Sequence, residues 1–357
     1  LYSSHRTFLA LFHVILAKIR IIETIPFLIL NFILSKSINM EDILFIKRDF
    51  IAENTDFLSL INVLESAFRN KTIQVPLRHH HDYENPTEGV DSTLLLMPAF
   101  DPGKAVGVKL VTVSPNNGKY NLPAIQGTYI YLDPHQGNIK AILDAPELTV
   151  KRTAAASALA SRYLSNPTAS TLLMVGTGAL APNLIKAHAA IRPLTKVMVW
   201  GRSLEKAKRI CQELAGAPYQ CIAVTSIDDH IGEADIISCA TLSAEPLIKG
   251  ALLKPGQHLD LVGAYKTTMR ESDDDVIKRA TIYVDTYQGG LKESGDILIP
   301  IQSGLLDPDS IGADLFELCS DQRKGREDTE SITCFKSVGH ALEDLAAANY
   351  YYDKFVS

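Results

Sequence analysis

A glycine-rich turn is the first segment of the sequence whose residue types could bind a ligand. The apolar run 171–175 predicts a strand, and a helical stretch over 183–191 follows the turn. Gly176 permits a tight turn, Gly178 lets backbone N–H groups approach a pyrophosphate, and Ala181 lets the helix pack closely on the strand. The pattern predicts dinucleotide binding at the helix N-terminus, and a turn without a ligand is the alternative. The candidate residues are Gly176, Thr177, Gly178, Ala179, Leu180 and Ala181.

The next predicted strand, 194–200, indicates which dinucleotide would bind. It ends at Gly201, Arg202 and Ser203, where an NAD site usually carries a carboxylate for the ribose hydroxyls. Arg202 and Ser203 can instead contact a 2′-phosphate through charge and hydrogen bonding. We therefore predict NADPH as the preferred cofactor and leave acceptance of NADH open. A solvated loop cation is the alternative for Arg202. The ends of two later strands supply the remaining cofactor candidates, Thr241 and Gly263.

Lys109 is a cation inside an otherwise apolar predicted strand, GVKLVT. Strand alternation places it on the same face as Gly107, Val111 and Val113. A lysine in such a strand is costly unless it is paired or lines a cavity. Lys109 is therefore a candidate site residue, with snorkelling from an edge strand as the alternative.

Two arginines are further candidates for contact with an anionic ligand. Arg152 lies among small residues near the start of an Ala-rich stretch, 147–164, that predicts a long helix, and Arg78 lies in VPLRHHHD. A helix-surface arginine and a loop arginine are the respective alternatives. The three consecutive histidines at 79–81 cannot all face one ion, and no carboxylate or cysteine partner accompanies them. We therefore predict no metal site.

The elements that must position these residues follow two different patterns. Residues 40–161 mix helical and strand periodicity, whereas short β-branched runs alternate with helical stretches from residue 171 onward. Strand–helix alternation predicts a parallel sheet with right-handed crossovers, so the fold class is α/β. The final segment, SVGHALEDLAAANYYYDKF, predicts a helix that packs back on the first region.

Residues 1–39 differ in composition from the rest of the chain. The segment is rich in Leu, Ile and Phe, but charged residues interrupt it, and its uninterrupted apolar run is shorter than the roughly 20 residues of a spanning helix. A signal peptide should end in a small-residue cleavage site, and Ser35-Lys36-Ser37 is a poor one. Because Met40 opens the first well-formed segment, we expect residues 1–39 to lie outside the fold. A membrane anchor is the alternative.

Composition excludes several other classes of protein. The 357 residues are 46% hydrophobic, which suffices for a large buried core, and 35 basic against 41 acidic residues give a net charge of −6. This balance disfavours a nucleic-acid binder. Five cysteines without a CxxC pattern or zinc-ligand spacing disfavour a disulfide framework. We therefore expect a cytoplasmic protein with no membrane partner.

From Met40 onward the sequence resembles the ornithine cyclodeaminase/μ-crystallin family. The resemblance implies a homodimer in which residues 40–161, completed by 338–357, form a mixed α+β substrate-binding and dimerisation domain. Residues 162–337 would form a Rossmann domain that binds NAD(P). The matching stretches are PLRHHH, GVKLVT, QGTYIYLD, VKRTAAASALASRYL, VGTGALA, VWGRS, ADIISCATLSAEP, LKPGQHLDLVGAYKTTMRE, YVDTYQGGLKESGDILIP and FKSVGHALEDLAAA.

The resemblance also implies that Arg78, Lys109 and Arg152 surround the carboxylate and the reacting carbon of a small-molecule cyclic imino acid. The two guanidinium groups would clamp the carboxylate. Lys109 would stabilise developing charge or relay a proton. Thr128 would help to orient the substrate, with an ordinary strand threonine as an equal alternative.

One departure separates branches of the family. Family cyclodeaminases carry an acidic residue directly after the glycine of the VG turn, and this chain has Ala264 there. Alanine cannot transfer a proton. The expected activity is therefore NAD(P)H-dependent reduction of Δ1-pyrroline-2-carboxylate to L-proline, or of Δ1-piperideine-2-carboxylate to L-pipecolate. The alternatives are an ornithine cyclodeaminase, an alanine or opine-type dehydrogenase, and a non-catalytic, crystallin-like NADPH-binding protein.

Overall fold

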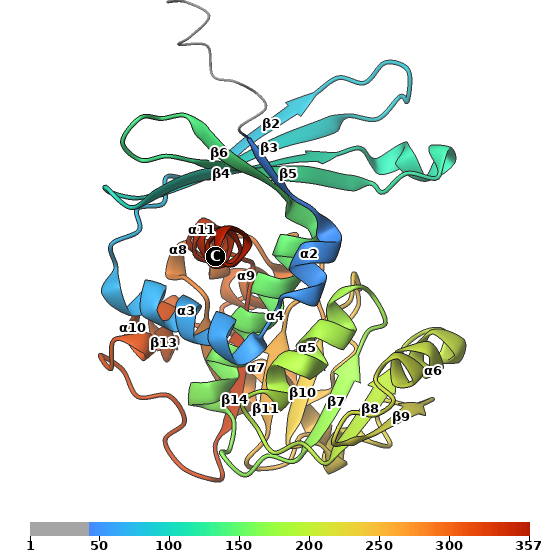
Figure 1. Ribbon diagram of the computed structural model, residues 1–357. Coiled ribbons are helices and arrows are strands. Elements are labelled where there is room, and N and C mark those ends of the chain that lie inside the picture. The colour runs from blue at the N-terminus through green and yellow to red at the C-terminus, as the bar shows by residue number, and fades with distance from the viewer. Residues whose placement is uncertain (1–42) are drawn as a thin grey trace, which may run out of the picture. The chain divides into compact units, whose positions relative to one another are not determined.

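The computed structural model describes residues 43–357, which build two β-sheets and the helices that pack on them (Figure 1). The predictions made for residues 1–39 lie outside the described residues. Between residues 43 and 357, every helix is too short or too polar to cross a bilayer.

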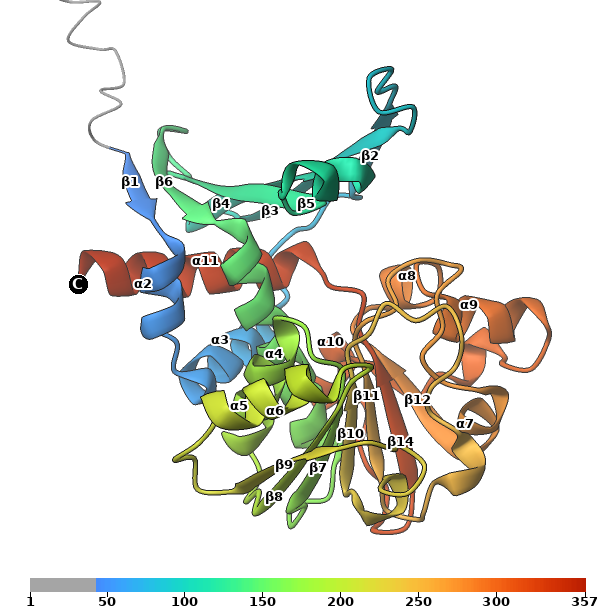
Figure 2. The ribbon, with the colours of Figure 1, turned by 90° about the vertical axis from the view of Figure 1, so that its right-hand side faces the viewer.

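The first sheet has six strands in the order β1-β6-β5-β4-β3-β2. The last five in chain order pair antiparallel with their neighbours. Helix α11 packs against β3 and β4, and Figure 2 shows it running along one face of the sheet. The strands are β1 (Leu44–Ile46), β2 (His79–Tyr83), β3 (Ser92–Asp101), β4 (Ala105–Val113), β5 (Ile125–Leu132) and β6 (Ile139–Asp144), and the C-terminal helix is α11 (Ala341–Val356).

Three further helices flank strands of this sheet in the chain: α2 (Arg48–Glu53) and α3 (Phe57–Asn70) lie between β1 and β2, and α4 (Ala145–Leu164) follows β6. The apolar side chains of α3 recur at helical spacing and are buried, as expected for an amphipathic helix. Helix α4 begins where Asp144 accepts a hydrogen bond from the Glu147 backbone N–H at 2.8 Å, a standard N-cap. Its small residues let α3, α5 and α11 pack around it. The predicted helix over 147–164 is thus confirmed, beginning two residues earlier.

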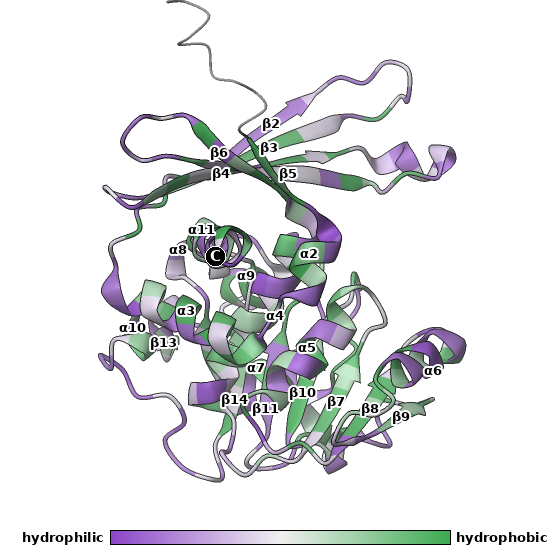
Figure 3. Cartoon of the chain, in the orientation of Figure 1, coloured by the Kyte–Doolittle hydropathy of each residue, from purple (hydrophilic) through white to green (hydrophobic). Residues whose placement is uncertain are grey.

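The second sheet contains eight parallel strands in the order β13-β12-β14-β11-β10-β7-β8-β9. They are β7 (Thr171–Val175), β8 (Lys196–Trp200), β9 (Gln220–Val224), β10 (Ile236–Cys239), β11 (His258–Leu261), β12 (Ala280–Val284), β13 (Ala313–Asp314) and β14 (Ile332–Lys336). Figure 3 shows these strands as largely hydrophobic, which agrees with burial on both faces. The predicted α/β class is confirmed.

Helices connect most of these strands. They are α5 (Leu180–Ala189), α6 (Leu204–Glu213), α7 (Asp274–Arg279), α8 (Tyr287–Gly290), α9 (Gly295–Gln302) and α10 (Leu315–Cys319), and the short 3-10 turns are η2 (Pro115–Tyr120), η3 (Ile231–Glu233), η4 (Gly250–Leu252) and η5 (Pro308–Ser310). Strand order reverses at β7, which lies between β10 and β8. Ligands of such sheets bind beyond the carboxyl ends of the strands at this reversal. Helix α4 crosses the predicted domain boundary after residue 161, so the domain limits stay a prediction.

Candidate functional site

The turn after β7 has the geometry that the glycine pattern predicts. Gly176 has φ +128°, and a Cβ added there would lie 2.5 Å from the carbonyl oxygen of Ala240. Only glycine fits this position, because the conformation and the close approach both exclude a side chain. Ala181 is fully buried in α5, where its size lets the helix pack closely. Ala179 and Leu180 begin this helix as its N-cap and first residue.

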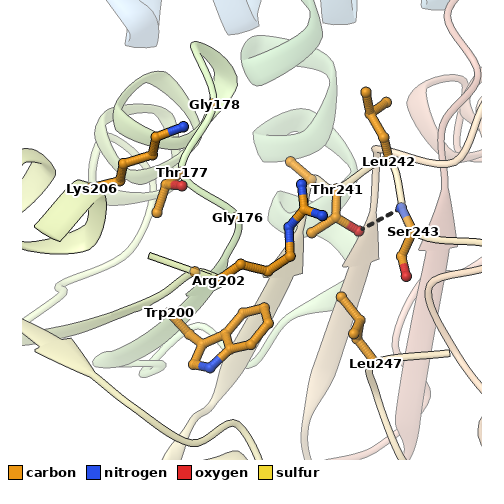
Figure 4. Close-up of a pocket in the computed structure, with 12 residues that line it drawn as sticks. Gly176, Thr177, Gly178, Trp200, Arg202, Lys206, Thr241, Leu242, Ser243 and Leu247 are labelled. Atoms are coloured by element: carbon orange, nitrogen blue, oxygen red, sulfur yellow. Dashed lines mark hydrogen bonds between the residues drawn. The ribbon is translucent and has the colours of Figure 1, made fainter. Parts of the chain in front are cut away.

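A groove of about 320 Å³ lies at the carboxyl ends of β7, β8 and β10 (Figure 4). Figure 4 shows the guanidinium of Arg202 extending across this groove toward Thr241. Five of the ten predicted cofactor residues line it. Its lining residues are Gly176, Thr177, Gly178, Trp200, Gly201, Arg202, Lys206, Ala240, Thr241, Leu242, Ser243 and Leu247.

The charged residues of the groove are both cations. Arg202 follows β8, as predicted, and Lys206 reaches the groove from α6. Lys206 was missed in the sequence, although it lies one helical turn after Ser203. Ser203 itself serves as the N-cap of α6 and accepts a hydrogen bond from the Lys206 backbone N–H. Because no carboxylate lines this groove among residues 43–357, it carries positive charge where an NAD site usually carries an acid.

A buried carboxylate, Glu271, joins the two loops that follow β10 and β11. It accepts hydrogen bonds from the backbone N–H groups of Thr241 and Gly263, both at 2.7 Å, and of Ala264 at 3.1 Å. Burial raises the pKa of Glu271, although Lys336 behind it acts in the opposite direction. The Lys336 ammonium lies 3.0 Å from Asp296 and 3.8 Å from Glu271. Glu271 therefore holds the predicted residues Thr241 and Gly263 together, a role that the sequence did not reveal.

Lys109 and Arg152 meet at one buried carboxylate. The Lys109 ammonium lies 2.7 Å from Oδ2 of Asp344 in α11, and Nε of Arg152 lies 2.8 Å from Oδ1 of the same residue. Arg152 also donates through Nη1 to Glu343 at 2.7 Å. Lys109 is only 3% exposed and Arg152 only 5%. Lys109 is therefore paired with an acid, as we expect of a lysine in an apolar strand, and it does not snorkel from an edge.

Arg78 comes within reach of this cluster through the loop that precedes α11. Its Nη1 donates to Glu293 at 3.0 Å and its Nη2 to the carbonyl oxygen of Gly339 at 3.3 Å. Gly339 has φ +84°, and a Cβ there would lie 2.7 Å from Nη1 of Arg152. This glycine therefore lets both guanidinium groups approach the start of α11.

Arg78 lines a second cavity of about 170 Å³. Met97 also lines it, and Met97 is the register partner of Lys109 on the adjacent strand. The complete lining is Val75, Pro76, Leu77, Arg78, Met97, Thr286, Gln288, Gly289, Lys292, Glu293, Gly339, His340 and Ala341. Thr286 follows β12 and Gly339 follows β14, so this cavity and the groove both lie at the carboxyl edge of the parallel sheet.

Burial and neighbouring charges shift the pKa values of the groups in this cluster in different directions. Burial lowers the pKa of Lys109 to about 8, even though Asp344 beside it acts to raise it. Burial alone would raise the pKa of Asp344, but Arg152 and Lys109 hold it below its usual value. Burial raises the pKa of Glu343 to about 7. At neutral pH the cluster therefore contains two buried cations that share one ionised carboxylate, and Lys109 is poised to exchange a proton.

Thr128 is not brought to this cluster. It pairs with Leu110 in the sheet, whereas Lys109 pairs with Tyr129, so Thr128 faces the opposite side of the sheet from Lys109. Its hydroxyl donates to the carbonyl oxygen of Leu143 within the sheet. The arrangement fits the alternative of an ordinary strand threonine.

The acids that pair with the three cations were missed in the sequence. Glu343 and Asp344 lie in an Ala- and Leu-rich stretch near the C-terminus, and Glu293 follows β12. The available signal was the presence of two adjacent acids within this Ala- and Leu-rich stretch, since buried acids require partners. Asp344 lies 192 residues after Arg152 and 235 residues after Lys109, so the sequence pattern does not reveal that they pair.

The three consecutive histidines lie on β2 and are exposed. Residues 43–357 hold no cluster of three or more His, Cys, Asp or Glu side chains suited to a metal ion. All five cysteines carry free thiols.

Comparison with known proteins places this geometry in context. The sequence profile of the ornithine cyclodeaminase/mu-crystallin family matches residues 42–357. A protein from Paracoccus denitrificans, named Delta(1)-pyrroline-2-carboxylate reductase, is 36% identical over 259 residues, which cover 72% of this chain and 82% of that protein.

Two solved structures share the fold over nearly their full length. One is the Thermococcus litoralis Δ1-pyrroline-2-carboxylate reductase in complex with NADH and L-proline, with a TM-score of 0.82 and 31% identity over 88% of this chain and 98% of that chain. The other is an archaeal alanine dehydrogenase dimer with bound NAD, with a TM-score of 0.80 and 25% identity over 88% of this chain and 96% of that chain.

Proposed function

Because the chain belongs to the ornithine cyclodeaminase/mu-crystallin family, we propose that it is a nicotinamide-dependent reductase of cyclic ketimine acids. The proposed reaction converts Δ1-pyrroline-2-carboxylate to L-proline, or its six-membered homologue to L-pipecolate. The similarity to two proteins named Δ1-pyrroline-2-carboxylate reductase supports the five-membered ring as the first substrate to test. The bound NAD of the alanine dehydrogenase dimer supports nicotinamide binding by this fold, and its assembly supports a homodimer.

The observation that carries this proposal is the convergence of Arg78, Lys109 and Arg152 at the start of α11. These cations come from three separate parts of the chain, and two of them are almost fully buried. Burial of cations is costly, and ion pairs with Asp344 and Glu343 offset part of that cost. Guanidinium groups bind carboxylates through parallel hydrogen bonds, so the cluster is suited to the carboxylate of a small acid.

Arg78 and Arg152 would hold the substrate carboxylate. Nε of Arg78 is buried and has no hydrogen-bond partner within residues 43–357, and Nη2 of Arg152 donates to no group in that range. Each arginine therefore keeps an N–H donor from which no described residue accepts. Lys109 has three N–H donors and contacts only Asp344 among described residues, so it can also donate to the substrate.

The groove fits the cofactor that this reaction needs. The turn at Gly176 provides the close backbone approach that a pyrophosphate requires, since a Cβ there would meet Ala240. Gly176, Thr177 and Gly178 would hold the pyrophosphate at the start of α5, and Arg202 would contact the adenosine ribose. When bound, the reduced nicotinamide supplies the hydride for the imine carbon.

We extend this proposal to NADPH as the preferred cofactor. Arg202→Ala should raise the KM for NADPH about 10- to 100-fold, because one charge-assisted hydrogen bond contributes roughly 1.5–3 kcal/mol. The KM for NADH should change less than about threefold, since NADH lacks the 2′-phosphate. Steady-state kinetics with both cofactors provides the measurement, and Arg209→Ala on α6, the helix that follows Arg202, is the control. Equal effects on both cofactors would contradict phosphate recognition by Arg202.

Glu271 is proposed as a positioning residue for the same cofactor. Glu271→Gln retains one carbonyl acceptor but cannot accept from the N–H groups of Thr241, Gly263 and Ala264 together. We expect the dissociation constant for the reduced cofactor, measured by its fluorescence, to rise about 10-fold, roughly one charge-assisted hydrogen bond. Glu271→Asp keeps the carboxylate on a side chain that is one methylene shorter, so it should bind the cofactor more weakly than wild type. An unchanged dissociation constant in Glu271→Gln contradicts this role.

The direct test of the proposed function is an assay of cofactor oxidation with five- and six-membered ketimine acids. The protein should oxidise the reduced cofactor with at least one of them and form the corresponding L-amino acid. Turnover of ornithine without net cofactor consumption would instead indicate a cyclodeaminase. Ala264 disfavours that outcome because it is fully buried and cannot exchange a proton.

A further inference from the structure

His340 is a titratable residue at the start of α11 to which the mechanism above assigns no role. It lines the same cavity as Arg78. It occupies the N-cap position of α11, yet its side chain makes no capping hydrogen bond. Its Nδ1 is buried and has no hydrogen-bond partner among residues 43–357. The ring packs edge-on against Phe316, with ring centroids 6.0 Å apart.

An unpartnered buried ring nitrogen requires an explanation. Leaving such a group unsatisfied costs about 1–3 kcal/mol, so most buried polar atoms have a partner. Phe316 contacts the ring, and the N-cap position fixes its backbone. The ring is therefore held in place at the wall of a cavity with hydrogen-bonding capacity to spare, as expected of a group that contacts a ligand.

The charges around His340 come from four separate parts of the chain. Burial lowers its pKa, Asp285 and Asp344 act to raise it, and Arg152 and Arg78 act to lower it further. Asp285 follows β12, Asp344 lies on α11, Arg152 lies on α4, and Arg78 precedes β2. The other titratable residues that line the cavity are Lys292 and Glu293. The two arginines that disfavour the imidazolium are the same two that would receive the substrate carboxylate.

We propose that His340 is a catalytic residue that donates a proton to the imine nitrogen of the substrate. The proposal rests on the reductase function proposed above. The bound carboxylate compensates the positive charge of Arg78 and Arg152, which allows the imidazole of His340 to take up a proton from solvent. The substrate thus triggers the protonation of its own acid catalyst.

The proton transfer balances as follows in the reaction. The imidazolium N–H bond breaks as an N–H bond forms on the imine, which yields a neutral imidazole and an iminium. The iminium carbon accepts a hydride with its electron pair from the reduced nicotinamide, so the substrate is reduced and the nicotinamide is oxidised. The imidazole is then neutral, as in the free protein, and takes up a solvent proton when the next substrate binds.

Proton uptake tests this proposal without turnover. Pyrrole-2-carboxylate, a planar ring acid that is not a ketimine, is titrated calorimetrically at neutral pH in buffers of different ionisation enthalpy. Wild type and His135→Gln, a control at an exposed histidine, should take up a fraction of a proton per site, and His340→Gln should take up almost none. Equal uptake by His340→Gln overturns the proposal. The proposal is also overturned if Lys109→Met loses proton uptake while His340→Gln keeps it, because the proton then belongs to Lys109.

The pH dependence of turnover provides a second, independent readout. Solvent protonates the imine at low pH, so the ratio of wild-type to His340→Gln kcat/KM should grow at least tenfold between about pH 5 and pH 8. A merely structural role of His340 gives a constant ratio, which overturns the proposal. Failure of the wild type to reduce any ketimine acid contradicts the proposed function itself, whereas a constant ratio in an active reductase contradicts only the role of His340.

Discussion

Replacement of Lys109 with methionine should lower kcat for ketimine reduction by about 10²–10⁴-fold, the range typical for loss of a proton-transfer or charge-stabilising group. Methionine keeps the length and apolar stem of the side chain but removes the ammonium. The effect should be large because Lys109 is almost fully buried and its pKa is lowered to about 8, so solvent cannot readily take its place.

The measurement is the initial rate of cofactor oxidation at saturating substrate, together with the thermal unfolding midpoint. The fold should survive, because Arg152 continues to pair with Asp344 when the ammonium is lost. Lys104→Met, at an exposed lysine in the turn between β3 and β4, is the control and should retain wild-type activity. A kcat for Lys109→Met within about threefold of wild type would falsify the assignment of Lys109 to the site.

Replacement of Arg152 with methionine should destabilise the protein by about 3–5 kcal/mol, the usual cost of removing one partner of a buried ion pair. Arg152 is the partner of both Glu343 and Asp344, and both carboxylates are fully buried. Its loss leaves Glu343 with no cation partner in the part of the chain that the structure describes, and Asp344 with Lys109 alone. Binding of the substrate carboxylate should be lost together with the stability.

A second substitution separates the stability effect from the binding effect. Arg152→Met combined with Glu343→Gln should recover part of the stability, because the uncompensated carboxylate is removed, but should not recover substrate binding. Chemical denaturation measures the stability, and a titration with pyrrole-2-carboxylate measures the binding of a substrate-like carboxylate. Arg323→Met, at an exposed arginine, should change neither. If Arg152→Met lowered the free energy of unfolding by less than about 1 kcal/mol, the ion pairs of Arg152 would contribute as little to stability as an exposed salt bridge.

The turn at Gly176 and the strand–helix alternation after residue 170 show that the local sequence determines much of the fold. Gly176 has φ +128°, a local backbone requirement of the turn, and Ala181 is buried in the helix that follows, so small residues spaced between a predicted strand and a predicted helix identify the turn. The orientation of Lys109 followed from strand alternation in the same way. Both are interactions between residues close in the chain, and the sequence pattern records them directly.

Tertiary structure decided which charges meet. The pairing of Lys109 and Arg152 with Asp344 joins β4, α4 and α11, and Glu271 joins the loop after β10 to the loop after β11. Neither is visible in the sequence, because spacing carries no information about which distant segments become neighbours. The side of the sheet on which Thr128 lies was likewise fixed only by its register with Leu110. Local steric requirements determined the turn and the elements, whereas the packing of distant segments determined the electrostatics of the site.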